Sequence, residues 1–204
     1  MRADGVAAEQ HPRSEEDGSK TILFFGDSLT AGYGLDPAQA FPALIQEKID
    51  GRGWKFRAVN AGLSGETTAG GLRRIDWVLQ RPIDVFVLEL GANDGGRGLP
   101  VEEARKNLQA IIERVRHKYP HVKLVLAGMR APSNLGKDYT TRFYEMFPAL
   151  AQVNKAALIP FLLEGVGGVP ALNLPDGIHP TPAGQKIVAE NVWSVLEPVL
   201  RELR

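Results

Sequence analysis

Three polar residues of this 204-residue chain have the types and the spacing that nucleophilic catalysis requires. Ser28 lies in a Gly-Asp-Ser turn, and Asp176 precedes His179 by three residues near the other end of the chain. A serine hydroxyl attacks well only when a neutral imidazole takes its proton and a carboxylate stabilises the imidazolium that forms. One short turn can bring the Asp176 carboxylate to Nδ1 of His179 and leave Nε2 aimed at Ser28. These residues predict acyl transfer, with Ser28 as nucleophile, His179 as base and Asp176 as its carboxylate partner.

Acyl transfer also needs hydrogen-bond donors at the place where the oxyanion of the tetrahedral intermediate develops. The candidate donors are the backbone N–H groups of Ser28 and Gly62 and the carboxamide of Asn93. Glycine suits a backbone donor, because no Cβ stands between it and the substrate. We therefore expect an oxyanion hole formed by Ser28, Gly62 and Asn93.

Each of these residues also has a purely structural interpretation. A serine in such a turn commonly caps the next helix, and Asp27 and Asp94 are expected to hold their loops through bonds to nearby backbone. Gly62 alone would be an ordinary turn glycine, and Asn93 alone would be an Asx turn. The functional interpretation depends on the four segments occurring together in one order.

The strands and helices that must position these side chains alternate along the sequence as in a parallel α/β protein. From Thr21 onward, short apolar runs alternate with longer amphipathic stretches, as in βαβ units. We expect five strands, at 21–25, 55–59, 85–90, 123–128 and 158–162. Ser28, Gly62 and Asn93 each follow one of the first three strands, at the carboxyl ends where open α/β sheets bind ligands.

Five helices are expected between and after these strands, at 38–49, 68–79, 101–118, 141–156 and 181–203. The third has apolar residues at helical spacing and ends before Pro120. The last begins with Thr181 as N-cap and Pro182 at its first position.

Composition narrows the class of protein further. The chain is 44% hydrophobic and carries 24 basic and 24 acidic residues, so the basic footprint of a nucleic-acid binder is missing. It has no cysteine, which excludes thiolate catalysis and cysteine metal sites. His117 and His121 have the spacing of a helical metal pair, but Pro120 breaks the helix that would align them. We expect no metal and no cofactor.

The expected domain organisation is simple. Residues 1–19 read as a disordered polar tail, and residues 20–204 as a single domain. The sequence contains neither an apolar signal core nor a run long enough to span a membrane, so no membrane insertion is expected.

The motif around Ser28, Phe-Gly-Asp-Ser-Leu-Thr, resembles the first block of the GDSL, or SGNH, hydrolase family. Gly62, the Gly-x-Asn-Asp motif ending at Asp94, and Asp176-x-x-His179 match the other three blocks. The resemblance covers about residues 21–200. Within the family, segments 30–34, 60–67 and 159–161 are similar to the bacterial multifunctional thioesterase, lysophospholipase and arylesterase branch.

The resemblance implies a flavodoxin-like three-layer α/β/α sandwich with a five-stranded parallel sheet. It also implies the Ser28, His179 and Asp176 triad, the oxyanion hole named above, and hydrolysis of a small-molecule ester, thioester or lysophospholipid without metal or cofactor. The loop 95–100 is expected to move over an acyl chain. The acyl pocket is expected near these loops, among Leu29, Tyr33, Leu99, Leu135, Tyr139, Phe143, Phe147, Val166 and Val169.

Other interpretations stay open on the sequence alone. The family also contains carbohydrate acetyl esterases, and a flavodoxin-like binding protein would instead use the Ser28 turn to hold a phosphate. A binding protein of that kind leaves Asp176 and His179 without a role. The branch implies a periplasmic or secreted protein if a signal peptide has been removed, and a cytoplasmic one otherwise. The oligomeric state does not follow from the sequence.

Overall fold

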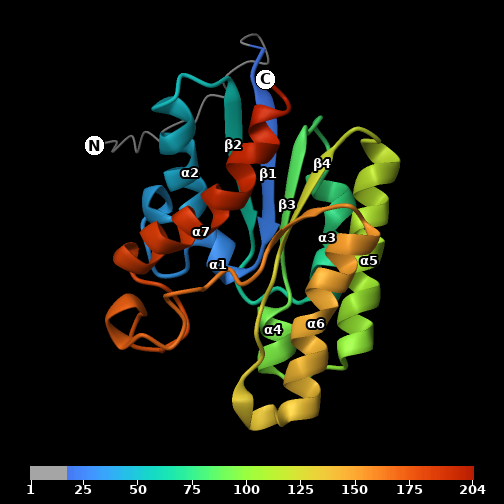
Figure 1. Cartoon of the computed structure of the whole chain (residues 1–204), viewed down its shortest axis with the longest axis vertical. Helices are drawn as coiled ribbons and strands as arrows, with labels where there is room; N and C mark the ends of the chain where they lie inside the picture. Colours follow the sequence, from blue (N-terminus) through green and yellow to red (C-terminus); the bar gives the residue numbers. More distant parts are fainter. Residues whose placement is uncertain (1–17) are drawn as a thin grey trace, which may run out of the picture.

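A computed structural model describes residues 18–204 of the chain as an α/β fold around one parallel sheet (Figure 1). The strand order is β2-β1-β3-β4-β5, and every neighbouring pair is parallel. The strands are β1 Lys20–Gly26, β2 Phe56–Gly62, β3 Val85–Glu89, β4 Lys123–Ala127 and β5 Ala157–Ile159. The expected α/β class with a five-stranded parallel sheet is confirmed.

Helices cover the sheet in two layers. Helices α2 (Phe41–Asp50) and α7 (Pro182–Arg201) pack together on one face, as Figure 1 shows. Helices α3 (Thr68–Val78), α5 (Val101–Lys118) and α6 (Lys137–Val153) pack in sequence on the other. All five residues of β3 are buried, as expected for a central strand covered on both faces.

The register of the three strands at the β2 side brings their carboxyl ends to one level. Gly26, at the end of β1, pairs with Gly62 of β2 on one side and with Glu89 of β3 on the other. The polypeptide leaves all three strands at this edge. The residues that follow β1, β2 and β3 are therefore held close together.

Two expected helices have a boundary where their sequence signals predict it. Helix α5 spans 101–118 as expected and buries its apolar stripe, Val101, Ala104, Leu108, Ile111, Ile112 and Val115. Helix α7 has Thr181 as its N-cap, and the Thr181 side chain accepts a hydrogen bond from the Gly184 N–H. Its first residue is Pro182, whose missing N–H would have no helical partner there.

Other boundaries differ from the expected ones for local reasons. The stretch expected as a helix from 38 breaks into a 3₁₀ turn, Pro37–Gln39, and α2, which starts at Phe41 with Pro42 in its first turn. Strand β5 ends at Ile159, because Pro160 has no N–H for the ladder. Strand β2 continues three residues beyond its expected end and includes Gly62.

Several short elements were not predicted at all. They are the helices α1 (Ser28–Ala31) and α4 (Ala92–Gly96) and the 3₁₀ turns Ser133–Leu135 and Pro170–Leu172. Helix α6 starts at Lys137, four residues before its expected start, and ends at Val153. Of the tail expected at 1–19, residues 1–17 lie outside the described part of the chain. The single-domain prediction for 20–204 stays a prediction.

A close backbone contact joins the ends of β4 and β5. Gly128 donates its N–H to the Ile159 carbonyl, and a Cβ built on Gly128 would lie 2.3 Å from the Pro160 carbonyl oxygen. No real Cβ approaches an oxygen so closely, and the obstructing atom belongs to backbone. Gly128 is required for this crossing.

We expect Gly128→Ala to lower the free energy of unfolding by about 1–3 kcal/mol, because it overpacks a rigid backbone contact. Urea denaturation measures the change. The matched control is Gly96→Ala, where an added Cβ meets no atom within 4 Å. Equal stability of the two variants would contradict the contact.

Candidate active site

Three side chains from distant parts of the chain meet at the carboxyl edge of the sheet. The Ser28 Oγ lies 2.9 Å from Nε2 of His179, and Nδ1 of His179 lies 2.7 Å from Oδ2 of Asp176. Ser28 is the first residue of α1, directly after β1, while the other two lie in the loop before α7. The structure thus brings together the serine, imidazole and carboxylate that the sequence singled out.

Asp176 and His179 are fixed to one another by a tight hairpin. Its base is closed by hydrogen bonds from the Leu174 N–H to the His179 carbonyl, 2.7 Å, and from the Thr181 N–H to the Leu172 carbonyl, 2.9 Å. Within it, Oδ1 of Asp176 accepts the N–H of Ile178 and of His179 at 2.9 and 3.0 Å. The His179 N–H bond, together with those from the Ile178 N–H and the imidazole, lowers the pKa of Asp176 to about 2.

Asn173 anchors this hairpin to the preceding loop. It is 6% exposed, and its Nδ2 donates to the carbonyls of Val166 and Val169 at 2.7 and 2.8 Å. It also forms an isolated antiparallel bridge with Pro180. The position of His179 therefore depends on a buried amide six residues away.

An aromatic ring packs against the imidazole. The ring centroids of Tyr33 and His179 are 4.5 Å apart with planes inclined at 39°. Tyr33 was predicted to contact substrate, and the structure places it beside the base with half of its surface exposed. It restricts the ring plane of His179 and leaves the Tyr33 edge open to a ligand.

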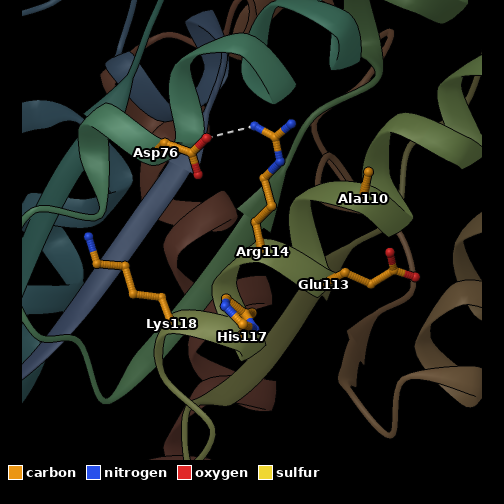
Figure 2. Close-up of a pocket in the computed structure, with 6 residues that line it drawn as sticks. All are labelled: Asp76, Ala110, Glu113, Arg114, His117 and Lys118. Atoms are coloured by element: carbon orange, nitrogen blue, oxygen red, sulfur yellow. Dashed lines mark hydrogen bonds and ion pairs between the residues drawn. The ribbon is translucent and has the colours of Figure 1, made fainter.

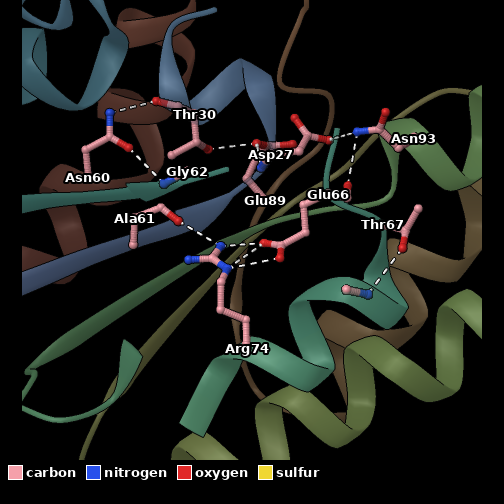
Figure 3. Close-up of polar contacts among 11 residues, drawn as sticks. Asp27, Thr30, Asn60, Ala61, Gly62, Glu66, Thr67, Arg74, Glu89 and Asn93 are labelled. Carbon is pink, nitrogen blue, oxygen red and sulfur yellow. Dashed lines mark hydrogen bonds and ion pairs between the residues drawn. The ribbon is translucent and has the colours of Figure 1, made fainter. Parts of the chain in front are cut away.

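Two buried acids, Asp27 and Glu89, lie close to one another at this edge of the sheet (Figure 3). Asp27 is fully buried, and its Oδ1 caps α1 by accepting the Leu29 N–H at 3.0 Å. Glu89, the last residue of β3, accepts the Asp27 N–H at 3.2 Å and the Thr30 hydroxyl at 2.7 Å on Oε2. Burial raises the pKa of Asp27 to about 6 and raises that of Glu89 well above its ordinary range, the latter with added repulsion from Asp27.

Two of the expected oxyanion donors are engaged elsewhere in this structure. The Gly62 N–H donates to Oδ1 of Asn60 at 2.9 Å, while Nδ2 of Asn60 donates to the Thr30 carbonyl at 2.9 Å. The Gly62 N–H is thus already engaged in this structure, and its expected place in the oxyanion hole stays a prediction. The Asn93 amide donates both to Oδ2 of Asp27, 3.2 Å, and to the Glu66 carbonyl, 3.0 Å (Figure 3).

Sequence reasoning did not single out a second glycine three residues further on, whose N–H is free within the described part of the chain. Among residues 18–204, no hydrogen bond takes up the N–H of Gly65 or of Ser28. Gly65 precedes Glu66, whose carbonyl binds Asn93, so its N–H lies on the loop that faces the Ser28 turn. The second glycine of the Gly-Leu-Ser-Gly segment was the available signal.

This loop is held by a buried ion pair. The Arg74 guanidinium binds both carboxylate oxygens of Glu66 through Nε, each at 3.0 Å, and donates to the Ala61 carbonyl at 2.9 Å. Arg74 also packs over the Phe25 ring, 4.4 Å from its centroid. At the start of the next helix, Thr68 binds the buried Asp94 carboxylate through its N–H and hydroxyl. Asp27 and Asp94 therefore have the loop-holding roles that their residue type predicts.

The expected acyl-pocket residues divide by exposure. Leu29, Phe143, Phe147 and Val166 are buried in the core. Tyr33, Leu99 and Val169 are exposed, and Leu135 and Tyr139 are half-buried. The loop at 95–100 is tied to α6 by the Tyr139 hydroxyl, which donates to the Leu99 carbonyl at 2.7 Å. The pocket assignment for the buried residues requires that their neighbours move.

A groove elsewhere on the surface is lined by none of the candidate site residues described above (Figure 2). It lies between α3 and α5, and His117, at the end of α5, lines it together with the ion pair of Asp76 and Arg114, 2.8 Å apart. Within residues 18–204, none of the helices is long and apolar enough to cross a membrane.

Comparisons with known proteins agree on one family. The GDSL-like lipase/acylhydrolase family matches residues 24–187. The chain is 41% identical to Esterase TesA of Pseudomonas aeruginosa over 92% of each protein. It is 35% identical to Thioesterase 1/protease 1/lysophospholipase L1 of Escherichia coli, over 88% of this chain and 85% of that protein.

A solved structure extends the likeness to three dimensions. The psychrotrophic esterase EstA from Pseudoalteromonas sp., in a structure inhibited by monoethylphosphonate, superposes with a TM-score of 0.84 at 32% identity. The match covers 90% of this chain and all of that one.

We expect Asn173→Ala to loosen the hairpin that carries Asp176 and His179. The change removes the two buried hydrogen bonds from Nδ2 to the Val166 and Val169 carbonyls, which should lower the free energy of unfolding by about 1–3 kcal/mol. Hydrogen exchange should speed up at the Leu174 and Thr181 amides, whose bonds close the hairpin. Ser194→Ala, an exposed change on α7, is the control, and unchanged exchange in Asn173→Ala would contradict the anchoring role.

Proposed function

This chain belongs to the GDSL-like lipase/acylhydrolase family and is a carboxylic ester hydrolase, and from that premise we propose that Ser28, His179 and Asp176 perform the reaction through an acyl-enzyme intermediate. The observation that supports this most directly is the continuous chain of contacts from Ser28 Oγ through the imidazole to Asp176, at 2.9 and 2.7 Å. This is the order of nucleophile, base and carboxylate that serine hydrolysis uses.

The first half of the reaction forms a covalent ester on the protein. Ser28 Oγ attacks the substrate carbonyl carbon, and its proton passes to Nε2 of His179. Asp176 accepts the Nδ1–H and stabilises the imidazolium. Collapse of the tetrahedral intermediate breaks the bond to the leaving group, which takes the proton from His179 and departs as an alcohol or a thiol.

In the second half of the reaction, water hydrolyses the acyl-enzyme and His179 again acts as base. Water attacks the acyl carbon while His179 takes one of its protons, and the second tetrahedral intermediate collapses to a free carboxylic acid. The proton on Nε2 returns to Ser28 Oγ. No group other than water is consumed after the acyl-enzyme forms.

The oxyanion is best stabilised by hydrogen-bond donors that have no other acceptor. We propose the N–H groups of Ser28 and Gly65, because no other group occupies them in the described part of the chain. Asn93 contributes once its amide exchanges one of its two present acceptors, Asp27 or Glu66, for the oxyanion. In this structure Gly62 holds β2 to α1 through Asn60.

The surface around Ser28 favours an acyl substrate with an apolar portion. Tyr33, Leu63, Leu99 and Ile178 are all at least one-third exposed, and each lies on a segment that carries or contacts the site. Exposed apolar side chains on the segments that form a site favour a ligand with an apolar portion. Thioesters and lysophospholipids are included in the proposed range, because the similar Escherichia coli protein is named for both activities.

We expect Ser28→Ala to abolish turnover of a p-nitrophenyl ester, by a factor on the order of 10⁶ as in a comparable serine triad. A phosphonate ester should attach to the Ser28 peptide of the wild type, detected by mass spectrometry, and to no peptide of the variant. Ser194→Ala controls for loss of a serine hydroxyl far from the site. Ester hydrolysis retained in Ser28→Ala would overturn the proposal.

The pH profile of kcat/KM tests the base. It is expected to fall as the pH is lowered toward about 5, because the imidazole must be neutral to accept the Ser28 proton. Asp176 stays anionic in this range, since its pKa is about 2. Asp176→Asn should lower kcat by about 10⁴-fold by removing the anion that orients the imidazole.

One other acid titrates in the same range and needs its own control. Burial raises the pKa of Asp27 to about 6, so the profile is also measured in Asp27→Asn. A falling limb that persists in this variant belongs to the imidazole. A flat profile between pH 5 and 8, with chemistry limiting the rate, would contradict the role of His179.

A further inference from the structure

Glu89 is a buried carboxyl group that the reaction described above does not use. It is 1% exposed and ends β3, where its backbone pairs with Gly26. A Cβ on Gly26 would lie 2.4 Å from Oε2 of Glu89 and 2.2 Å from Oγ1 of Thr30. The absence of a side chain at position 26 is therefore what allows Glu89 to reach the turn that carries Ser28.

Glu89 bonds both sides of that turn with a single oxygen. Its Oε2 accepts the Asp27 N–H, immediately before Ser28, and the Thr30 hydroxyl, two residues after it. Its other oxygen, Oε1, is buried without a hydrogen-bond partner in the described part of the chain. A carboxylate buried in this way would have only two bonds to replace its hydration, which is a costly arrangement for a charge.

No cation compensates this acid. In the described residues, no lysine, arginine or histidine forms an ion pair with Glu89, whereas the neighbouring Glu66 is paired with Arg74. The charged group that acts on Glu89 is Asp27, and Asp27 in turn is influenced by His179. Two adjacent carboxylates in a dry site cannot both ionise cheaply, so one of them retains a proton.

The hydrogen bonds decide which acid retains it. Asp27 accepts the Leu29 N–H and the Asn93 amide, and His179 favours it as an anion. Glu89 is next to that anion and has one oxygen unpaired. The proton therefore belongs on Glu89, and the charge on Asp27.

We propose that Glu89 is a positioning residue that holds the Ser28 turn as an uncharged carboxylic acid. As an acid it accepts the Asp27 N–H and the Thr30 hydroxyl on Oε2, and it carries its proton on the otherwise unpaired Oε1. Asp27 can then cap α1 and orient Asn93 as an anion. An uncharged Glu89 also adds no second negative charge behind the developing oxyanion. The effect of Glu89 on turnover depends on the proposed role of Ser28, while the protonation state of Glu89 does not.

The experiment compares Glu89→Gln with Glu89→Ala. The amide is uncharged and keeps the shape and both acceptor bonds, so Glu89→Gln should retain turnover close to that of the wild type. Glu89→Ala removes the acceptors and lets the turn shift, which should lower kcat by about 10²-fold with little change in KM. Loss of turnover in Glu89→Gln equal to that in Glu89→Ala would overturn the proposal, because it would show that the charge is needed.

Infrared difference spectroscopy tests the protonation state directly. The wild-type minus Glu89→Gln spectrum at pH 7 should contain the carbonyl stretch of a protonated carboxylic acid. The matched control is Glu66→Gln, which removes an ion-paired glutamate and should give only carboxylate bands. Carboxylate bands alone for Glu89 would overturn the proposal, whether or not Glu89→Ala folds.

The same measurement in a Ser28→Ala background separates the two proposals. The acid band is expected to persist there, since it does not depend on the nucleophile. An active Ser28→Ala protein with the acid band would overturn the catalytic role of Ser28 alone. An inactive one without the band would overturn the role of Glu89 alone.

Discussion

The site depends on the common level at which β1, β2 and β3 end. The pairing of Gly26 with both Gly62 and Glu89 sets the height of the Ser28 turn, of the loop that carries Gly65 and of the buried acid beneath them. Bonds from Asn60 and Glu89 then fix α1 to its two neighbouring strands. A slip of one strand would separate all of these groups together, so sheet register and catalytic geometry are one constraint.

Much of this arrangement follows from local sequence signals. Alternating apolar runs and amphipathic stretches were enough to place five strands and five long helices, and the rule that ligands bind at strand ends selected the correct edge. Asp176 and His179 could be paired in advance because three residues of separation permit one turn. Short elements escaped prediction, since α1 and α4 have only four and five residues and lack a helical period.

The features of the site that the sequence did not predict depend on tertiary contacts between distant segments. Gly62 and Gly65 look alike in sequence, and only the bond from the Gly62 N–H to Asn60 distinguishes them. Glu89 reads as the polar end of an apolar strand, and its role appears only when β3 lies beside Gly26. Phe143 and Val166 follow the site motifs in chain order, but Phe143 lies on the buried face of α6 and Val166 is buried in the loop that precedes the hairpin.

The hairpin from Leu172 to Thr181 gives the site a simple mechanical property. It contains both the carboxylate and the imidazole, and its own backbone bonds hold them together. A rigid displacement of this hairpin would preserve the distance from His179 to Asp176 and change only the distance from His179 to Ser28. The site then has a single adjustable coordinate, and the proton acceptor can disengage from the nucleophile without losing its own counterion.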